Sequence, residues 1–197
     1  MMFYDVATNN HGLELDPFYA LVGPRPIGWI STLSKDGVAN LAPYSFYNAF
    51  GHNPSYVAFG SGGYKDSLRN AADTGEFAVN MATYDLREAM NMTSSEGGQD
   101  EFELAGLEKA ACRLIKSPRV AASPVCLECK FFKSVELPDE QGQVNDWLVI
   151  GKVIGVHVDE KFIENGRVNT AAMKPIARLG YAEYTTVESV WKMRRPE

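Results

Sequence analysis

The chain has 197 residues, of which 45% are apolar and 22% charged, a composition typical of one globular domain. Nineteen basic against 25 acidic residues give a net charge of −6, which argues against broad nucleic-acid binding and against a polybasic membrane-binding surface. No apolar run reaches the roughly 18 residues that a membrane span needs, and the N-terminus lacks a signal-peptide pattern. Three cysteines, a low and odd number, fit a reducing compartment, so we expect a cytoplasmic protein.

The first part of the chain predicts short strands joined by tight turns. Residues 27–33 are rich in β-forming side chains, and the Asp36-Gly37 pair behind them is a strong hairpin signal. Residues 38–41 should therefore return antiparallel to the first strand. A further strand is expected at residues 56–59.

A glycine-rich turn at residues 60–63 leads to a predicted helix that begins at Asp66 and ends before Gly75. Asp66 is the expected N-cap, because an aspartate at that position can accept the helix's first N–H groups. Residues 76–81 then return as a strand. A second helix is predicted from about Tyr84, where apolar residues recur at helical spacing.

The second half predicts a polar excursion at residues 94–107 and then two long strands. In the first strand, residues 125–131 alternate between apolar and polar, so one face should be buried. The second strand, residues 144–158, is long and evenly apolar, and Gly151 and Gly155 mark places where it could bend around a barrel corner. A mostly antiparallel barrel with two short helices accounts for this order of elements.

Two cysteines, Cys126 and Cys129, have the spacing of half a zinc site or of a redox pair. A structural zinc site usually needs four ligands, the chain has no second pair, and its three histidines are scattered. Residues three apart on a strand also point to opposite faces. We therefore expect buried strand cysteines and no metal ion, and we expect His157 to serve packing rather than acid–base chemistry.

The glycine turn and helix start at residues 60–67 match neither a P-loop nor a dinucleotide fingerprint. A helix start can still hold an anion through its backbone N–H groups. If Asp66 occupies those donors, a phosphate would be held from the side by Ser61, Lys65 and Arg69. An ordinary capped helix after a surface turn is the alternative.

Two isolated arginines stand in surroundings of low charge. Arg25 lies between two prolines, and Arg178 precedes a Leu-Gly pair. An arginine in such a setting suits a bidentate clamp on an oxyanion, and it equally suits a structural ion pair. The sequence leaves both roles open.

Six segments, in this order, resemble the flavin reductase-like family of FMN-binding split barrels. They are residues 25–32, 40–47, 65–70, 76–80, 151–159 and 175–180. The stretch 40–47 together with Lys65-Asp66 is the most specific part, and the likeness covers about residues 21–184.

The resemblance implies a mostly β fold, a six-stranded antiparallel split barrel with a few short helices. It implies one domain over residues 1–197, with the barrel core at about 21–184, and a homodimer that holds FMN near the subunit interface. Thr32 and the 40–48 segment would line the isoalloxazine and ribityl chain, and Ser61, Lys65 and Arg178 would serve the phosphate. The full set of cofactor-binding residues carried over by position is Arg25, Ser31, Thr32, Asn40, Ala42, Ser45, Phe46, Tyr47, Asn48, Ser61, Lys65, Asp66 and Arg178.

The activity that the resemblance implies is an NAD(P)H-dependent flavin reductase, in which NADH or NADPH passes a hydride to N5 of FMN. This chemistry belongs to the cofactor and needs no protein nucleophile or acid–base pair, so we expect no catalytic side chain. Three alternatives remain open: a flavoredoxin-like electron carrier, the reductase component of a two-component monooxygenase, and a barrel of this family that has lost its flavin. The first two would add an oxygenase or electron-transfer partner.

Overall fold

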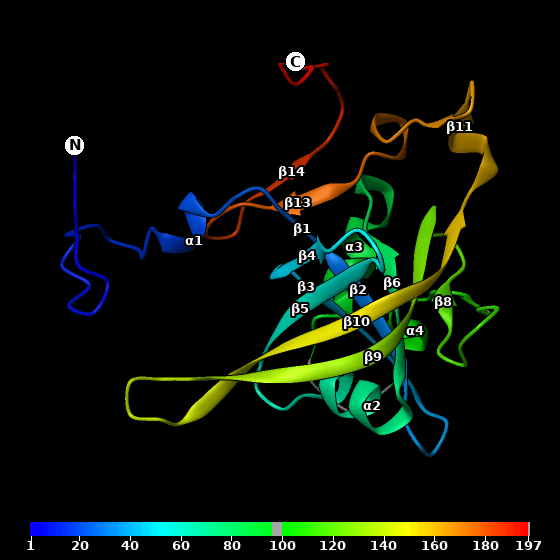
Figure 1. Cartoon of the computed structure of the whole chain (residues 1–197), viewed down its shortest axis with the longest axis horizontal. Coiled ribbons are helices and arrows are strands. Elements are labelled where there is room, and N and C mark those ends of the chain that lie inside the picture. The colour runs from blue at the N-terminus through cyan, green and yellow to red at the C-terminus, as the bar shows by residue number, and fades with distance from the viewer. Residues whose placement is uncertain (96–99, 197) are drawn as a thin grey trace.

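A seven-stranded antiparallel sheet organises the chain (Figure 1). The computed structural model describes residues 1–95 and 100–196. The strands lie in the order β3-β2-β6-β9-β10-β5-β4. Their bounds are β2 Gly28–Leu33, β3 Ala39–Tyr44, β4 Tyr47–Phe50, β5 Tyr56–Gly62, β6 Glu76–Met81, β9 Val125–Pro138 and β10 Val144–Val158.

Shorter elements surround this sheet. Three small antiparallel sheets have the strand orders β1-β13-β14, β7-β8 and β11-β12. Their bounds are β1 Arg25–Pro26, β7 Lys109–Ala110, β8 Arg119–Val120, β11 Ile163–Glu164, β12 Arg167–Val168, β13 Ile176–Arg178 and β14 Tyr184–Thr186. The helices are α1 Phe18–Leu21, α2 Asp66–Thr74, α3 Arg87–Met92 and α4 Glu101–Leu104, with 3-10 turns η1 Tyr84–Leu86, η2 Glu160–Phe162 and η3 Ala171–Met173.

The mostly β, antiparallel character predicted from the sequence is confirmed, while the main sheet has seven strands rather than six. The additional strand is β4, an edge strand that pairs only with β5 among the described residues. Three of its four residues are exposed, so it carries no apolar–polar alternation that would reveal a strand in the sequence.

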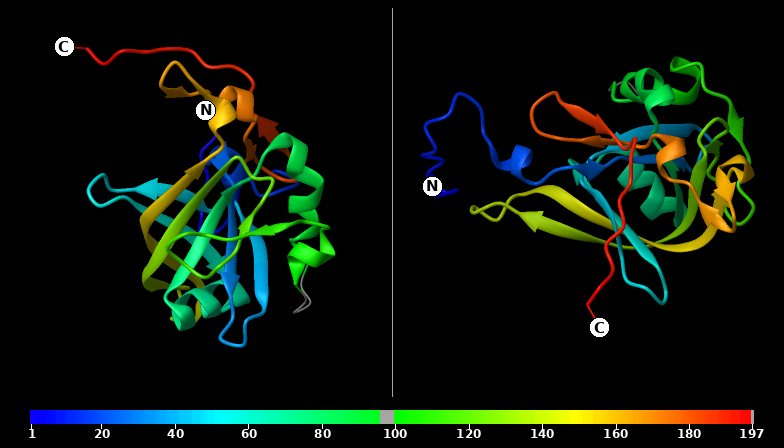
Figure 2. Two further views of the ribbon diagram at one scale, coloured as in Figure 1. Left: turned by 90° about the vertical axis from the view of Figure 1, so that its right-hand side faces the viewer. Right: turned by 90° about the horizontal axis from the view of Figure 1, so that it is seen from above.

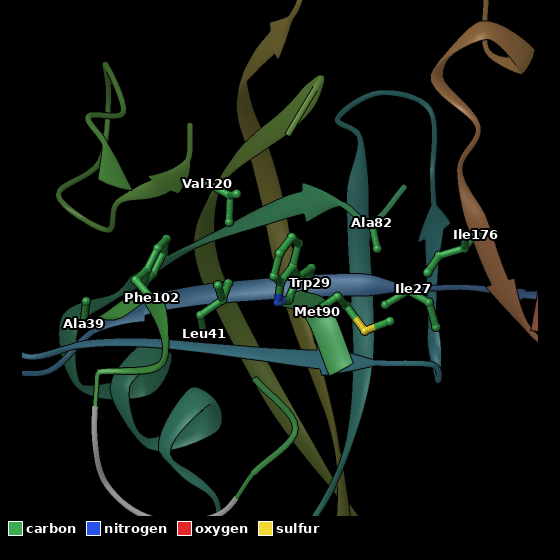
Figure 3. Packing of buried hydrophobic residues seen from close by; sticks show 9 residues of the cluster. All are labelled: Ile27, Trp29, Ala39, Leu41, Ala82, Met90, Phe102, Val120 and Ile176. Carbon is green, nitrogen blue, oxygen red and sulfur yellow. The ribbon is translucent and has the colours of Figure 1, made fainter. Parts of the chain in front are cut away.

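The first five residues of β2 are all buried. Since successive side chains of a strand point in opposite directions, both faces of β2 are buried. Ile30 packs with Phe59, Phe77 and Leu68 in one core cluster. Trp29 points the other way, into a second cluster with Met90 of α3 and other residues of the outer layer (Figure 3). Two apolar cores therefore hold the central strand from both sides.

Helix α2 closes one end of the first core and lies below the sheet in Figure 1. Leu68 and Ala71 are its fully buried apolar residues. The helix ends at Gly75, whose φ of 76° is the left-handed conformation that a glycine adopts without a Cβ penalty. The predicted helix end is confirmed.

Strands β9 and β10 form a long hairpin that projects from the sheet (Figures 1 and 2). Their pairing shifts register at Ile150/Gly151 and at Val153/Gly155, so the two glycines do mark irregularities in the strand, as predicted. At Gly151 a Cβ would lie only 2.3 Å from the Phe77 ring, which only glycine avoids.

Strand β9 departs from the prediction of a single buried face. Cys126, Glu128 and Cys129 are all buried, although Cys126 and Glu128 belong to the face expected to be polar and exposed. The reason is tertiary: the backbone of Arg113 and Leu114 covers this face and donates to the Glu128 carboxylate. Strand alternation cannot report such a covering segment.

The polar excursion predicted at residues 94–107 includes 96–99, which lie outside the described residues. The rest of it is not wholly exposed, because Phe102 of α4 is buried in the Trp29 cluster and Glu101 is buried beside it. Across the described part of the chain, no helix combines the length and apolar character that crossing a membrane requires.

Candidate functional site

A polar cavity of about 400 Å³ lies where β3, the start of α2 and the α3–α4 segment meet. This volume falls in the range of small-molecule sites. Polar and charged side chains make up most of its wall. The lining residues are Asn40, Ala42, Pro43, Tyr44, Tyr64, Lys65, Asp66, Ser67, Arg69, Thr93, Ser94, Ser95 and Glu101.

The start of α2 lies in this cavity without a side-chain cap. The prediction that Asp66 caps the helix is wrong: the N-cap position is Lys65, and Asp66 is already the first helical residue. The Asp66 carboxylate instead pairs with Arg69, one turn further on. Among the described residues, no side chain caps the first N–H groups of α2, so they remain suited to an anion.

Asn40 of β3 fixes the polar groups next to that helix start. Its amide donates to Ser67 Oγ at 2.9 Å and to Thr32 Oγ1 at 3.2 Å. Asn70 donates to the same Thr32 oxygen at 3.2 Å. Thr32 is fully buried behind the cavity wall, so it orients Asn40 and Asn70 rather than lining the cavity itself.

The Tyr44 hydroxyl reaches the same place. Burial raises the pKa of Tyr44, and hydrogen bonds with Ser67 and Ser61 offset part of that rise. The phenol therefore stays neutral near pH 7 and can donate a hydrogen bond. Tyr44 lies inside the 40–47 motif, but it is absent from the cofactor-binding residues that the resemblance implies.

Glu101 of α4 brings a carboxylate to the opposite wall. It is 6% exposed, and its Oε2 accepts the Leu41 N–H at 2.9 Å. Burial raises the pKa of Glu101, and the negative charges of Asp100 and Asp66 add to that rise. No sequence pattern marks Glu101 as a site residue, because a glutamate in a polar segment is ordinarily solvated.

The other predicted residues gather elsewhere. Two adjoining open cavities, of about 620 and 470 Å³, lie beside β1 and β13 and share Arg25, Ser45 and Phe46. Arg178 lines the first of them, and Tyr47 and Asn48 line the second. The structure thus divides the predicted set into two groups, which meet along the chain at Tyr44–Ser45.

The arginines of this second region donate to oxygens of the chain itself. Arg25 donates to the Val22 carbonyl at 2.7 Å, to the Leu179 carbonyl at 2.8 Å and to the Tyr19 carbonyl. Arg178 donates to the Tyr184 hydroxyl at 2.5 Å and to the Tyr181 carbonyl. The sequence left a structural ion pair open as an alternative role for both arginines. Among the described residues, neither arginine forms one.

Three predicted residues line none of these three cavities: Thr32, described above, Ser31 and Ser61. Ser31 is fully buried and donates to the Pro118 carbonyl at 2.5 Å. Ser61 is buried and donates to the Gly63 carbonyl at 2.9 Å. Ser61 affects the site only through the pKa of Tyr44, which it lowers slightly against the effect of burial.

A family model described as the flavin reductase like domain matches residues 23–176 of this chain. The chain belongs to this family. An uncharacterized protein of Aquifex aeolicus is 35% identical to it, over 88% of this chain and 90% of the relative. An uncharacterized protein of Bacillus subtilis, YwrF, is 33% identical, over 88% of each chain.

Solved structures of similar proteins agree with the flavin reductase-like assignment. Nitrilotriacetate monooxygenase component B from Bacillus cereus is 30% identical, with a TM-score of 0.86 over 98% of both chains. The 2-nitrobenzoate 2-nitroreductase NbaA of Pseudomonas fluorescens is 26% identical, with a TM-score of 0.83 over 98% of this chain and 96% of that one. A Shewanella frigidimarina protein named as a putative flavin reductase with a split barrel domain is 22% identical and has the same fold, with a TM-score of 0.85 over the whole of both chains.

Proposed function

We propose that this flavin reductase-like protein binds FMN, with the phosphate at the start of α2, and catalyses oxidation of NADH or NADPH by the bound flavin. The observation that carries the proposal is the uncapped helix start, which lies beside Lys65 and Ser67 in a cavity of ligand size. Backbone N–H groups, a hydroxyl and an ammonium form a donor set that matches a phosphate dianion.

The residues around the phosphate position have distinct roles. Lys65 supplies positive charge, and Ser67 supplies a hydroxyl whose place is fixed by the amide of Asn40. Arg69 holds the Asp66 carboxylate through their ion pair and thereby weakens its repulsion of an anion. The backbone N–H groups and the Ser67 hydroxyl are held by the fold before the ligand arrives, which lowers the ordering cost of binding.

The wall formed by Asn40, Ala42 and Tyr44 continues from the phosphate position along β3. We place the ribityl chain and the isoalloxazine ring along it. Bound FMN would supply the hydride-accepting N5 atom, so the protein has to bind, orient and desolvate rather than transfer protons through a side chain. That Arg25, Ser45, Phe46, Tyr47, Asn48 and Arg178 also contact FMN stays a prediction, but we place the phosphate on neither arginine, because both donate to oxygens of the chain itself.

Similarity supports an oxygenase partner, whereas the homodimer stays a prediction from the sequence motifs. The Bacillus cereus relative is named as a component of nitrilotriacetate monooxygenase. We therefore propose an oxygenase as the acceptor of reduced flavin, and we propose separately a homodimer with FMN near its interface. A cytoplasmic location also stays a prediction.

The test has two steps on the purified full-length chain. The first is equilibrium titration with FMN, which we expect to saturate at one FMN per chain. The second is the loss of NADH or NADPH absorbance with and without FMN. Saturable binding with no oxidation of either nicotinamide would contradict the reductase and favour the electron carrier, and no saturable binding would contradict both.

A further inference from the structure

A thiol, a carboxylate and an imidazole converge away from the cavity proposed for FMN. They belong to Cys112, Glu128 and His157, and their potential ligand atoms all lie within 4.8 Å of one another. Glu128 and His157 line a separate cavity of about 500 Å³, which shares no lining residue with the cavity at the start of α2. The proposed flavin chemistry uses none of the three.

Glu128 is the fixed point of this cluster. It is 1% exposed on β9, yet it is held by two backbone donors, the Arg113 N–H at 2.8 Å and the Leu114 N–H at 2.6 Å. Hydrogen bonds of this kind orient a carboxylate in the way that outer-shell partners orient metal ligands. The same covering segment, residues 112–114, also brings Cys112 to the cluster.

His157 comes from the neighbouring strand β10, where its Nε2 lies 2.5 Å from Glu128 Oε1. Its side chain is 22% exposed, so the ring forms part of the cavity wall rather than of the core. Three separate segments of the chain thus direct one soft and two harder ligand atoms to a single point.

We propose that Cys112, Glu128 and His157 form a binding site for Zn²⁺. Thiolate sulfur, imidazole nitrogen and carboxylate oxygen are the ligand types that Zn²⁺ takes in proteins. Ligands bonded at about 2.0–2.3 Å around a tetrahedral ion lie roughly 3.3–3.8 Å apart, within the reach of this cluster once the His157–Glu128 hydrogen bond opens by about 1 Å. Three protein ligands leave one position, directed to the cavity, for water.

The charges around the cluster are compatible with a divalent cation. A thiolate and a carboxylate together neutralise Zn²⁺, so Arg113 and Arg119 in the cavity wall would face a neutral centre rather than a dication. The Arg119 Nε is buried without a hydrogen-bond partner among the described residues. It could donate to a hydroxide or a small anion at the open position.

Cys112 and Glu128 are 16 residues apart along the chain, and Glu128 and His157 are 29 apart, so the three ligands form no metal-binding sequence motif. The pair that does have motif spacing, Cys126 and Cys129, is not in the cluster, and Cys129 packs in the core on the other side of β9. The expectation of no metal ion rested on the lack of a second cysteine pair and on the scattering of the three histidines along the chain, and neither observation reports which residues the fold brings together.

The test uses the full-length protein after removal of metal by a chelator. Titration with Co²⁺, a spectroscopic substitute for Zn²⁺, should give one ion per chain with thiolate-to-cobalt charge-transfer absorption, and Zn²⁺ should displace it. Cys112→Ser and His157→Gln should each weaken Zn²⁺ binding by at least the roughly 10–100-fold loss typical of outer-shell changes, because they remove a ligand itself.

The matched control is His52→Gln, which changes an exposed loop histidine and should leave Zn²⁺ affinity unchanged. A wild-type protein that binds no Co²⁺, or binds it without a thiolate band, would overturn the proposal whether or not the variants fold. Unchanged Zn²⁺ affinity in a folded His157→Gln variant would overturn it as well. FMN titration of the same samples reports separately on the proposed function.

Discussion

At the start of α2, Lys65 lies beside helix N–H groups that have no side-chain cap, whereas beside β1 and β13 the arginines Arg25 and Arg178 donate to carbonyl and hydroxyl oxygens of the chain itself. Both regions bring cations to a concave surface. The first region combines its cation with the N–H groups of a helix start and with the Ser67 hydroxyl, which the Asn40 amide holds in place.

The difference separates an anion site from a structural clamp. Arg25 ties the segment around α1 to the chain after β13, through the carbonyls of Val22 and Leu179. An arginine whose hydrogen-bond donors are directed to fixed neutral oxygens has fewer of them left for a ligand. The comparison therefore predicts that substitutions in the two regions will affect different measurements.

The largest effect on FMN binding is expected from Lys65→Ala. Loss of a hydrogen bond to a charged group costs about 1.5–3 kcal/mol, so the Kd for FMN should rise roughly 10–100-fold. The measurement is fluorescence titration of FMN. The matched control is Lys35→Ala, an exposed lysine paired with Asp73, which should leave the Kd unchanged.

The same fluorescence titration of an Arg178→Ala variant tests whether the second region contributes to FMN binding. Since the Arg178 guanidinium is already engaged by Tyr184 and Tyr181, we expect less than about a threefold rise in the FMN Kd, or under ~0.7 kcal/mol. If Arg178→Ala weakened FMN binding more than Lys65→Ala did, the two regions would have the opposite roles.

Arg25→Ala should instead lower the free energy of unfolding, by about 1–2 kcal/mol, because three backbone carbonyls lose a charged donor. Urea denaturation measures this change. Arg167→Ala, an exposed arginine on β12, is the control and should cost less than about 0.5 kcal/mol. Equal stability of the two variants would argue against a structural clamp at Arg25.

Asn40→Ala tests whether the cavity is preorganised. Removing the amide leaves the buried hydroxyl of Thr32 with one fewer donor and frees Ser67 to rotate. We expect a loss of about 1 kcal/mol in stability and a rise of a few fold in the FMN Kd. A change in stability with an unaltered Kd would show that Ser67 does not contact the phosphate.

The smallest expected effect is on how the free energy of unfolding changes with pH. It involves Glu101 in the cavity and Glu76, a buried carboxylate outside it. Burial raises the pKa of Glu101. Burial also acts to raise the pKa of Glu76, but hydrogen bonds from Lys130 Nζ at 2.7 Å and the Lys116 N–H at 2.5 Å outweigh it and lower that pKa. The two groups therefore affect stability with opposite sign as the pH changes.

Stability from Glu101 is fully present below its ordinary pKa and is lost as the pH rises through the raised value. Stability from Glu76 is present above its ordinary pKa and is lost as the pH falls through the lowered value. Glu101→Gln should thus stabilise the protein at about pH 7 relative to about pH 4, and Glu76→Gln should do the reverse. Urea denaturation at the two pH values measures both, and matching signs would contradict these assignments.

Local patterns predicted much of the sheet and the helix α2. The β6 bounds were predicted from composition, the Asp36-Gly37 turn joins β2 and β3 as expected, and Gly75 ends α2. Strand β4 was missed because an exposed edge strand needs no alternation. The buried Glu128 was missed because its donors come from a separate covering segment.

The candidate site was predicted in part. Asn40, Ala42, Lys65 and Asp66 do line one cavity, since their motifs lie at the facing ends of β3 and α2. Glu101 could not be predicted, because tertiary contacts bring α4 to this wall: Phe102 packs in the Trp29 cluster, and Glu101 accepts the Leu41 N–H. The N-cap of α2 was predicted one residue too late. The cap position is Lys65, and Asp66 is already the first residue of the helix; sequence patterns do not define helix ends to a single residue.

The most direct test of the central claim is a crystal structure of the full-length protein with FMN. The account predicts the phosphate at the start of α2, within hydrogen-bond distance of Lys65 and Ser67. A phosphate bound instead against Arg25 or Arg178, with no flavin density in the cavity between β3 and α2, would contradict it.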